Sequence, residues 1–203
     1  MIICGKNLKM CCSFKDKTII LASQSPRRRE LLEMAGINFR VENISGINED
    51  YPQNIPISEI PLFIANQKLE VYKHFWSLPN HVVIAADTIV SFENQILGKP
   101  KDKNEAYQML SFLSGKTHKV ITGVILKSDS KSVEFTSETN VTFKPLTKAV
   151  INYYLDNYNP IDKAGAYGIQ EWIGLTSISR IDGSYFNVMG LPVDRVWDEL
   201  NGF

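Results

Sequence analysis

Apolar positions along the chain alternate between short continuous runs and helically spaced sets, a pattern typical of an α/β fold. Residues 17–23 form an apolar run that predicts a buried strand. It leads into a helix over residues 27–34 that Gly36 is placed to end. Residues 81–92, HVVIAADTIVSF, form a continuous run rich in β-branched residues. Such a run predicts a central strand buried on both faces of a parallel or mixed sheet.

The other predicted elements follow from the same spacing and from turn and cap residues. We expect helices over residues 61–72, 102–113 and 147–157 and after Pro192, and strands over residues 38–43, 117–126, 133–143 and 173–181. The strands 117–126 and 133–143 should pair as an antiparallel hairpin. Residues 46–61, rich in Gly, Asn and Pro, and residues 162–170, DKAGAYGIQ, are predicted loops.

Composition narrows the class of protein. With 203 residues, 44% of them hydrophobic, the chain can build a core without disulfides. The 22 Lys and Arg residues balance the 22 Asp and Glu residues, so no overall field favours duplex DNA or an anionic membrane. No apolar run approaches the roughly 18 to 20 residues of a membrane span. We therefore expect a cytoplasmic protein with no membrane and no stable nucleic-acid partner.

The first 17 residues differ from the rest of the chain. They hold all three cysteines, Cys4, Cys11 and Cys12, and several lysines that interrupt any secretory signal. One adjacent pair and a third cysteine, with no histidine nearby, make a poor disulfide framework and a poor zinc site. We interpret residues 1–17 as a flexible N-terminal extension and residues 18–203 as a single domain.

The helix over residues 27–34 begins with an unusual concentration of positive charge. Ser25 suits the N-cap and Pro26 the first helical position, which places three arginines in the first turn, Arg27, Arg28 and Arg29. A helix start already carries positive charge, so each cation there costs about 0.3 to 1 kcal/mol. A bound phosphate would relieve that conflict. The alternative is a basic turn in solvent, beside the glutamates of the same helix.

Three further residues stand out as candidates for chemistry. Asp87 lies inside the predicted central strand, where a carboxylate needs a metal, a cation or several donors; the alternative is an Asp that caps a turn at a strand end. Lys99 lies between Gly98 and Pro100 in a constrained loop, from which an ammonium could reach a phosphate. Lys68 lies off the apolar stripe of its helix, and taken alone it reads more simply as a solvated lysine.

Six ordered motifs together resemble the Maf family of nucleoside triphosphate pyrophosphatases. The resemblance covers residues 19–200, and its motifs are SPRRRELL, AADTIV, LGKPKDKNEA, MLSFLSGKTH, DKAGAYGIQ and DGSYFNVMGLP. It implies an elongated fold with a mixed, curved sheet, flanking helices and a central cleft between two lobes, similar to inosine triphosphatases. It also implies a homodimer and a divalent metal cation, Mg²⁺ or Mn²⁺.

The resemblance also implies roles for single residues. Asp87 matches the proton acceptor, and Arg28, Lys68 and Lys99 match positions that bind the substrate. Glu49, with Asp87, matches the position of a metal-binding carboxylate. Asn48 departs from the acid usual at its position, so Asp50 is an alternative to Glu49. Three positions separate the branches of the family, and here they resemble the dTTP and UTP branch: Arg27, Thr88 and Gln170.

These residues imply hydrolysis of a pyrimidine nucleoside triphosphate to the monophosphate and pyrophosphate. The amide of Gln170 can donate and accept at once, as the edge of thymine or uracil requires. Alternatives are a 7-methyl-GTP pyrophosphatase, whose branch usually has an aromatic residue in place of Arg27, and a nucleotide-sensing regulator of cell division or septum formation. A single-stranded nucleic-acid binder is disfavoured by the zero net charge.

Overall fold

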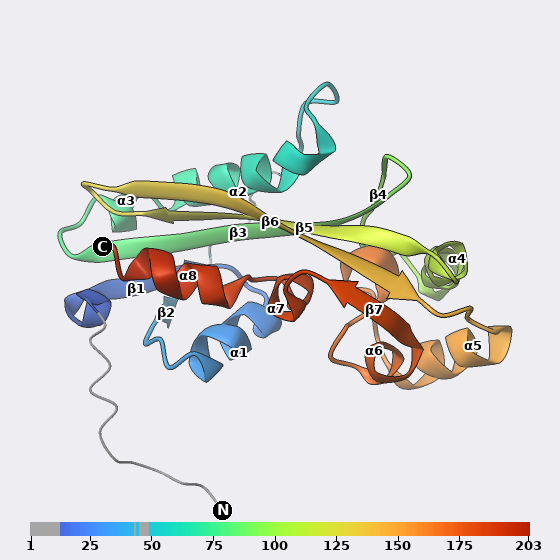
Figure 1. Cartoon of the computed structure of the whole chain (residues 1–203). Coiled ribbons are helices and arrows are strands. Elements are labelled where there is room, and N and C mark those ends of the chain that lie inside the picture. The colour runs from blue at the N-terminus through green and yellow to red at the C-terminus, as the bar shows by residue number, and fades with distance from the viewer. Residues whose placement is uncertain (1–12, 43, 45–48) are drawn as a thin grey trace, which may run out of the picture.

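A single mixed sheet runs the length of the molecule (Figure 1). The structure, a computed structural model, describes residues 13–42, 44 and 49–203. Within these residues the sheet has seven strands: β1 (Thr18–Ala22), β2 (Arg40–Val41), β3 (His81–Phe92), β4 (Gln95–Leu97), β5 (Thr117–Lys127), β6 (Ser132–Phe143) and β7 (Ile178–Asp182).

The order of the strands is β2-β1-β3-β5-β6-β7, with β4 paired to β3 off this path. β1 is parallel to both β2 and β3, whereas β3, β5, β6 and β7 pair antiparallel. β5 and β6 form the predicted hairpin, with Thr117 opposite Thr142 and Lys127 opposite Ser132. The expected α/β fold with an elongated mixed sheet is confirmed.

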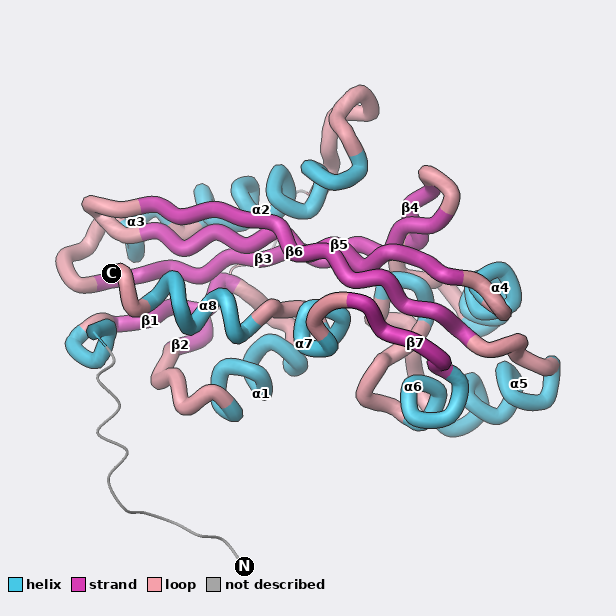
Figure 2. The backbone as a smooth tube through the Cα atoms, in the orientation of Figure 1, coloured by secondary structure: helices cyan, strands magenta, loops and turns pink. Residues whose placement is uncertain are grey.

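Helices cover both faces of the sheet (Figures 1 and 2). In chain order they are α1 (Pro26–Met34), α2 (Ile60–Val71), α3 (Lys73–Trp76), α4 (Lys103–Leu113), α5 (Lys148–Asn157), α6 (Trp172–Ser177), α7 (Tyr185–Met189) and α8 (Val193–Leu200), with short 3₁₀ turns at Ser13–Asp16, Ile57–Glu59 and Ala164–Ala166. Figure 1 shows α2 and α3 on one face, α1 and α8 on the other, and α4, α5 and α6 at the far end. None of these helices, within the part of the chain that is described, is long and apolar enough to span a membrane.

The central strand β3 is buried on both faces, as its apolar run predicts. Val82 and Ile84 belong to the larger core, which includes side chains of α1, α4, α5 and α8. Val83 and Ala85 point the other way, into a second core with side chains of α2. Because successive side chains of a strand alternate between faces, a strand between two cores is apolar on both faces wherever it packs against them, as over residues 82–86.

A glycine lets α2 lie close against the sheet. Gly123 of β5 pairs with Asp87 of β3. A Cβ at Gly123 would lie 2.3 Å from the backbone nitrogen of Leu62, at the start of α2. The helix backbone therefore packs directly onto the strand next to Asp87, and this contact sets where the later residues of α2 lie over the sheet.

Two predicted strands are wrong in extent or type. The segment predicted as a strand over residues 173–181 begins as helix α6, and only β7 is strand. Its buried positions, Ile173 and Ser177, are four residues apart, which is helical spacing, while Leu175 between them is 79% exposed. The strand predicted over residues 38–43 is reduced to the two residues of β2.

Part of the predicted N-terminal extension is packed against the domain. The 3₁₀ turn Ser13–Asp16 places Phe14 in the larger core, where its ring meets Trp197 of α8 edge to face at 5.2 Å. Residues 13–16 therefore contact the domain, and the division into an extension over residues 1–17 and a domain over residues 18–203 stays a prediction. Cys4, Cys11 and Cys12 lie outside the described residues.

Candidate active site

One cavity of about 550 Å³ brings together residues from distant parts of the chain. It lies where the end of β1 and the start of α1 meet β3, α7 and the loop after α5. All eight residues singled out in the sequence line it: Arg27, Arg28, Glu49, Lys68, Asp87, Thr88, Lys99 and Gln170. This size suits a nucleotide-sized ligand. The predicted central cleft is therefore present, and the roles of its residues stay predictions.

A lysine between two carboxylates forms one end of the cavity. The Nζ atom of Lys68 is 2.7 Å from Asp87 Oδ1 and 2.7 Å from Glu49 Oε1. Lys68 and Asp87 are only 12% and 14% exposed. Lys68 is thus a buried, paired cation rather than a solvated helix lysine, and Asp87 lies within β3 rather than capping its end. The position of Lys68 over the sheet depends on the close packing of α2 at Gly123.

The electrostatics of this end keep Glu49 ionised. Burial by itself raises the pKa of Glu49, but the hydrogen bond and charge of Lys68 outweigh it. The charges of Lys99 and Arg28 act in the same direction, and the pKa lies below its ordinary value. The carboxylate of Glu49 contacts Lys68, and Glu49 lines the cavity. The backbone carbonyl of Asp50 accepts a hydrogen bond from Gln67, and the choice between Glu49 and Asp50 stays a prediction. Asn48 lies outside the described residues.

The donor set at this end fits a divalent cation that is shared with a phosphate. Among the residues that the structure describes, no three His, Cys, Asp or Glu side chains come together as a metal cluster. Glu49 and Asp87 nevertheless converge on one point, now held by the ammonium of Lys68. Mg²⁺ is commonly held by one or two carboxylates together with substrate phosphates, rather than by a complete protein cage. Two carboxylates are therefore sufficient for such a site.

The three arginines at the start of α1 have different environments. Arg28 is buried: its Nε donates to Gly190 O, its Nη1 to Ser23 Oγ and Ala86 O, and its Nη2 to Thr88 Oγ1. These bonds use four of the five N–H groups of the guanidinium and leave one toward the cavity. Burial lowers the pKa of Arg28, although the Asp87 charge opposes that effect. Protein acceptors, rather than a phosphate alone, thus relieve the strain expected of this helix start.

The other two arginines and the N-cap differ in part from expectation. Arg27 pairs with Asp162, and Arg29 is half-buried with its Nη2 donating to Gln24 O. Ser25 occupies the N-cap position, but its side chain makes no capping hydrogen bond. The backbone N–H of Ser25 donates instead to Ser23 Oγ.

A chain of buried hydroxyl groups supports Thr88. Its Oγ1 accepts from Arg28 and lies 2.9 Å from Thr122 Oγ1. Thr122 is fully buried and donates to the backbone oxygen of Asn187, so Thr88 must donate to Thr122 or to Gly190 O. Thr88 therefore reaches the cavity as part of a network that also holds Arg28 in place.

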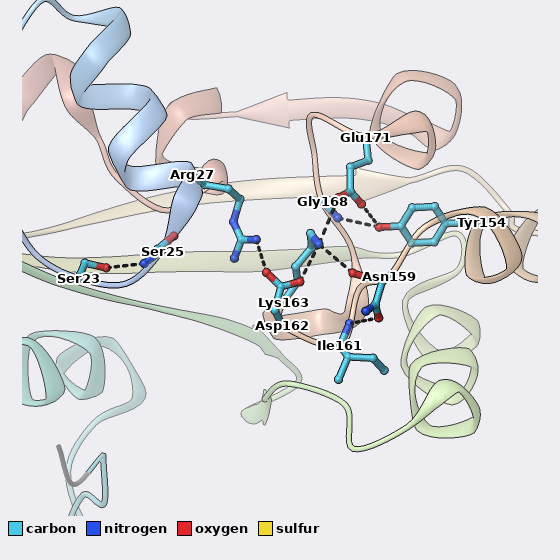
Figure 3. Close-up of polar contacts among 10 residues, drawn as sticks. All are labelled: Ser23, Ser25, Arg27, Tyr154, Asn159, Ile161, Asp162, Lys163, Gly168 and Glu171. Atoms are coloured by element: carbon cyan, nitrogen blue, oxygen red, sulfur yellow. Dashed lines mark hydrogen bonds and ion pairs between the residues drawn. The ribbon is translucent and has the colours of Figure 1, made fainter. Parts of the chain in front are cut away.

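A second set of charged side chains lies across the cavity (Figure 3). Arg27 Nη1 is 2.8 Å from Asp162 Oδ2, and Asp162 Oδ1 is 2.7 Å from Lys163 Nζ. Lys163 also lies 3.2 Å from Glu171 Oε1, and the other oxygen of Glu171 accepts a hydrogen bond from Tyr154. This set connects the start of α1 with the loop over residues 158–171.

The same loop carries Gln170. The Oε1 atom of Gln170 is buried and has no hydrogen-bond partner within the described residues, which suits a group that a ligand would satisfy. Gly165 shapes the loop: its φ is +71° and a Cβ there would lie 3.1 Å from Val90 of β3. The N–H of Gly165 donates to Gly98 O at 3.1 Å, which ties this loop to the one that carries Lys99.

Sequence reasoning missed several residues of the site. Asp162 opens the motif DKAGAYGIQ but was assigned no role, and Glu171 and Thr122 are common polar residues with no distinguishing local pattern. Asp162 meets its partner Arg27 across 135 positions of sequence. Tyr154, expected to be half-buried, is fully buried and holds Glu171. No local signal could identify such partners, because only the fold brings them together.

Comparisons with known proteins point the same way as the motifs. The sequence model of the family described as Maf-like protein matches residues 18–203. A dTTP/UTP pyrophosphatase of Phocaeicola vulgatus is 50% identical over 182 residues, which are 90% of this chain and 94% of that protein. A dTTP/UTP pyrophosphatase of Parabacteroides distasonis is 49% identical over 191 residues, 94% of this chain and 98% of that protein.

A solved structure also resembles the chain. The structure of the Ham1 protein of Staphylococcus aureus superposes with a TM-score of 0.47 and 15% sequence identity, covering 92% of this chain and 99% of that one.

Proposed function

Because this chain belongs to the Maf family, we propose that it is a nucleoside triphosphate pyrophosphatase that hydrolyses dTTP and UTP to the monophosphate and pyrophosphate. CTP and modified pyrimidine nucleotides are further candidate substrates. The observation that carries the proposal is the cavity in which Lys68 contacts both Asp87 and Glu49 and which Gln170 also lines.

Asp87 is the residue to which we assign the proton of the attacking water. Its Oδ1 accepts a hydrogen bond from Lys68, which fixes the orientation of the carboxylate and leaves Oδ2 for the water. Attack at the α-phosphorus breaks the bond to the β-phosphate and releases pyrophosphate. Lys68, Lys99 and the remaining N–H of Arg28 offset the negative charge that the transition state carries, and charge stabilisation of this kind is usually the largest catalytic contribution.

Glu49 and Asp87 are the residues that would hold a divalent cation, Mg²⁺ or Mn²⁺, together with the phosphates. Such an ion, when bound, supplies positive charge against the triphosphate and makes a nearby water more acidic. Lys68 contacts both carboxylates at 2.7 Å and must then share them or turn toward a phosphate oxygen. Its flexible stem and rotatable ammonium allow either arrangement.

We assign the recognition of the nucleobase to Gln170, Arg27 and Thr88. The unpartnered Oε1 of Gln170 accepts the N3–H of thymine or uracil while the amide N–H₂ donates to O4. A site that leaves a buried acceptor unpaired with the wrong base discriminates strongly against that base.

The direct test is pyrophosphate release from a panel of nucleoside triphosphates, with Mg²⁺ or Mn²⁺ and with chelator alone. We expect turnover of dTTP and UTP that requires the cation. Turnover of 7-methyl-GTP instead would favour that branch, and binding of nucleotides without any release would favour a sensing role in cell division.

The variant Asp87→Asn tests the assignment of Asp87 as the general base. The variant should lose turnover of dTTP by about 10²-fold or more, as expected for loss of general base catalysis, while it binds the nucleotide within a few-fold of the parent. Near-normal turnover by the folded variant would refute the assignment.

We further propose that the protein is a homodimer of the cytoplasm. Light scattering of the purified chain tests the first part, and fractionation of cells tests the second. A monomer at micromolar concentration would contradict the dimer.

A further inference from the structure

The two charged groups in the cavity differ in their balance of charge. The group around Lys68 has three cations and two carboxylates, and its net positive charge suits the triphosphate. Its members are Lys68, Arg28, Lys99, Glu49 and Asp87. The group across the cavity has two cations and two carboxylates, Arg27, Lys163, Asp162 and Glu171. A balanced group holds no net charge for a phosphate to neutralise, so it suits the uncharged base of the nucleotide.

Asp162 is the bridge of this balanced group (Figure 3). Its two oxygens are divided between two cations, with Oδ2 at 2.8 Å from Arg27 Nη1 and Oδ1 at 2.7 Å from Lys163 Nζ. Lys163 is 10% exposed and is held further by Asn159 O at 3.1 Å. One end of the bridge is thus anchored in the protein, and the other end fixes the guanidinium of Arg27 on the opposite wall.

The bridge continues to the segment that presents Gln170. Lys163 contacts Glu171, which follows Gln170 directly in sequence. Glu171 accepts the hydroxyl of Tyr154, and that hydroxyl accepts the N–H of Gly168 at 3.1 Å. Contacts therefore hold the chain on both sides of Gln170, and a single network sets the positions of Arg27 and Gln170 relative to each other.

We propose that Asp162 is a positioning residue for substrate specificity, which orients Arg27 across the cavity toward the base that Gln170 reads. The proposal rests on the proposed function. Burial by itself raises the pKa of Asp162, but hydrogen bonds from Lys163 and Arg27 and their charges outweigh it and hold the pKa below its ordinary value. Asp162 thus stays a carboxylate at neutral pH.

A double-mutant cycle tests whether Asp162 acts through Arg27. The parent, Asp162→Asn, Arg27→Ala and the double variant are compared by kcat/KM for dTTP and UTP and for ATP and GTP. Asp162→Asn should reduce the preference for pyrimidines about threefold to fivefold, the size that a part-exposed ion pair supports. In the Arg27→Ala background the same change should have less than about a twofold effect, because the interaction is already lost.

Asp156→Asn is the matched control. Asp156 also pairs with a lysine, Lys103, and is 58% exposed, close to the 56% of Asp162, but this pair lies at the second hollow between α4 and α5. Its substitution should leave the pyrimidine preference unchanged. Asp162→Glu keeps the negative charge and should recover part of the preference.

Two results would overturn the inference. One is an unchanged pyrimidine preference in Asp162→Asn; the other is an equal loss in the parent and Arg27→Ala backgrounds, which would show that Asp162 acts independently of Arg27. Calorimetric titration of the same four proteins with dTTP and GTP measures discrimination in binding. If the parent binds nucleotides without releasing pyrophosphate, the proposed activity fails, and these titrations still decide the role of Asp162.

Discussion

Replacing Lys68 with Met removes the cation that holds two carboxylates together in the cavity. The methionine has a similar length and no charge, so the variant isolates the electrostatic contribution of the ammonium. Lys68 is 12% exposed and touches Asp87, 14% exposed, and Glu49, 49% exposed, each at 2.7 Å. The substitution leaves Asp87 close to buried with its ion pair broken.

The cost can be estimated from these exposures. Breaking a fully buried ion pair by removing one partner destabilises a protein by about 3 to 5 kcal/mol. The half-exposed pair with Glu49 contributes at most about 1 kcal/mol, and the carboxylates that remain can be solvated in part through the open cavity. We therefore expect Lys68→Met to lower the free energy of unfolding by about 2 to 3 kcal/mol at pH 7, or the melting temperature by about 5 to 10 °C.

Urea denaturation measures this free energy, with Lys103→Met as the control. Lys103 pairs with Asp156 on the surface, where the two side chains are 60% and 58% exposed, so its loss should cost less than about 0.5 kcal/mol. Equal costs for the two variants would refute the reasoning.

The pH dependence gives an independent check. In the parent, Glu49 has a lowered pKa in the folded state, so it adds stability above its ordinary value of 4.5 that is lost as the pH falls through the folded value. Without Lys68 the effect of burial on the pKa of Glu49 is opposed only by the charges of Lys99 and Arg28, so the variant loses most of this stabilising contribution. The difference in the free energy of unfolding between the parent and Lys68→Met should therefore become smaller as the pH falls below 4.5. A difference that stays constant from pH 7 to pH 4 would contradict this account.

Three further predictions follow from buried groups near the site. Burial lowers the pKa of His118 from 6.5 to about 4. The parent should therefore lose about 3 kcal/mol of unfolding free energy between pH 6.5 and 4, whereas His118→Gln should not. Urea denaturation across that pH range measures the difference. Gly123→Ala places a Cβ 2.3 Å from the backbone of α2 and should lower stability by about 3 kcal/mol and also reduce turnover, whereas Gly98→Ala, with open space around it, should change stability little. Thr122→Val removes the hydroxyl between Thr88 and Asn187 O and should lower the free energy of unfolding by about 1 to 3 kcal/mol, as measured by thermal unfolding. Thr122→Ser keeps the hydroxyl and should recover most of this loss. Equal losses in the two variants would show that packing, rather than the hydrogen bonds, accounts for the effect.

The sequence alone was sufficient for the fold class and for the eight cavity residues. The continuous apolar run of β3 predicts burial on both faces, and the structure places its alternate residues in two separate cores. The motifs singled out Asp87, Lys68 and Gln170, and the structure places all three in one cavity. The apolar run of β3 could be interpreted from local periodicity, whereas most of the cavity residues were identified through the resemblance of ordered motifs to a known family.

Local pattern failed where the outcome depended on packing. Residues 173–177 were predicted to be the start of a strand, but Ile173 and Ser177 are both buried and the segment belongs to helix α6. The four protein acceptors of the Arg28 guanidinium were also not predicted from its place at a helix start, and its role as a phosphate ligand stays a prediction. Three of those acceptors lie on segments distant in sequence or are backbone oxygens, which have no signature in the sequence.

Which residues carry the charge, and where most of the helices and strands form, was thus determined by the sequence. Which charges face each other was decided by the tertiary structure alone. Asp162 becomes the partner of Arg27 across 135 positions because the loop after α5 returns to the start of α1 at the cavity. An ion pair requires two atoms within 4 Å, and for residues so far apart only the packing of the whole sheet and its helices brings them to that distance.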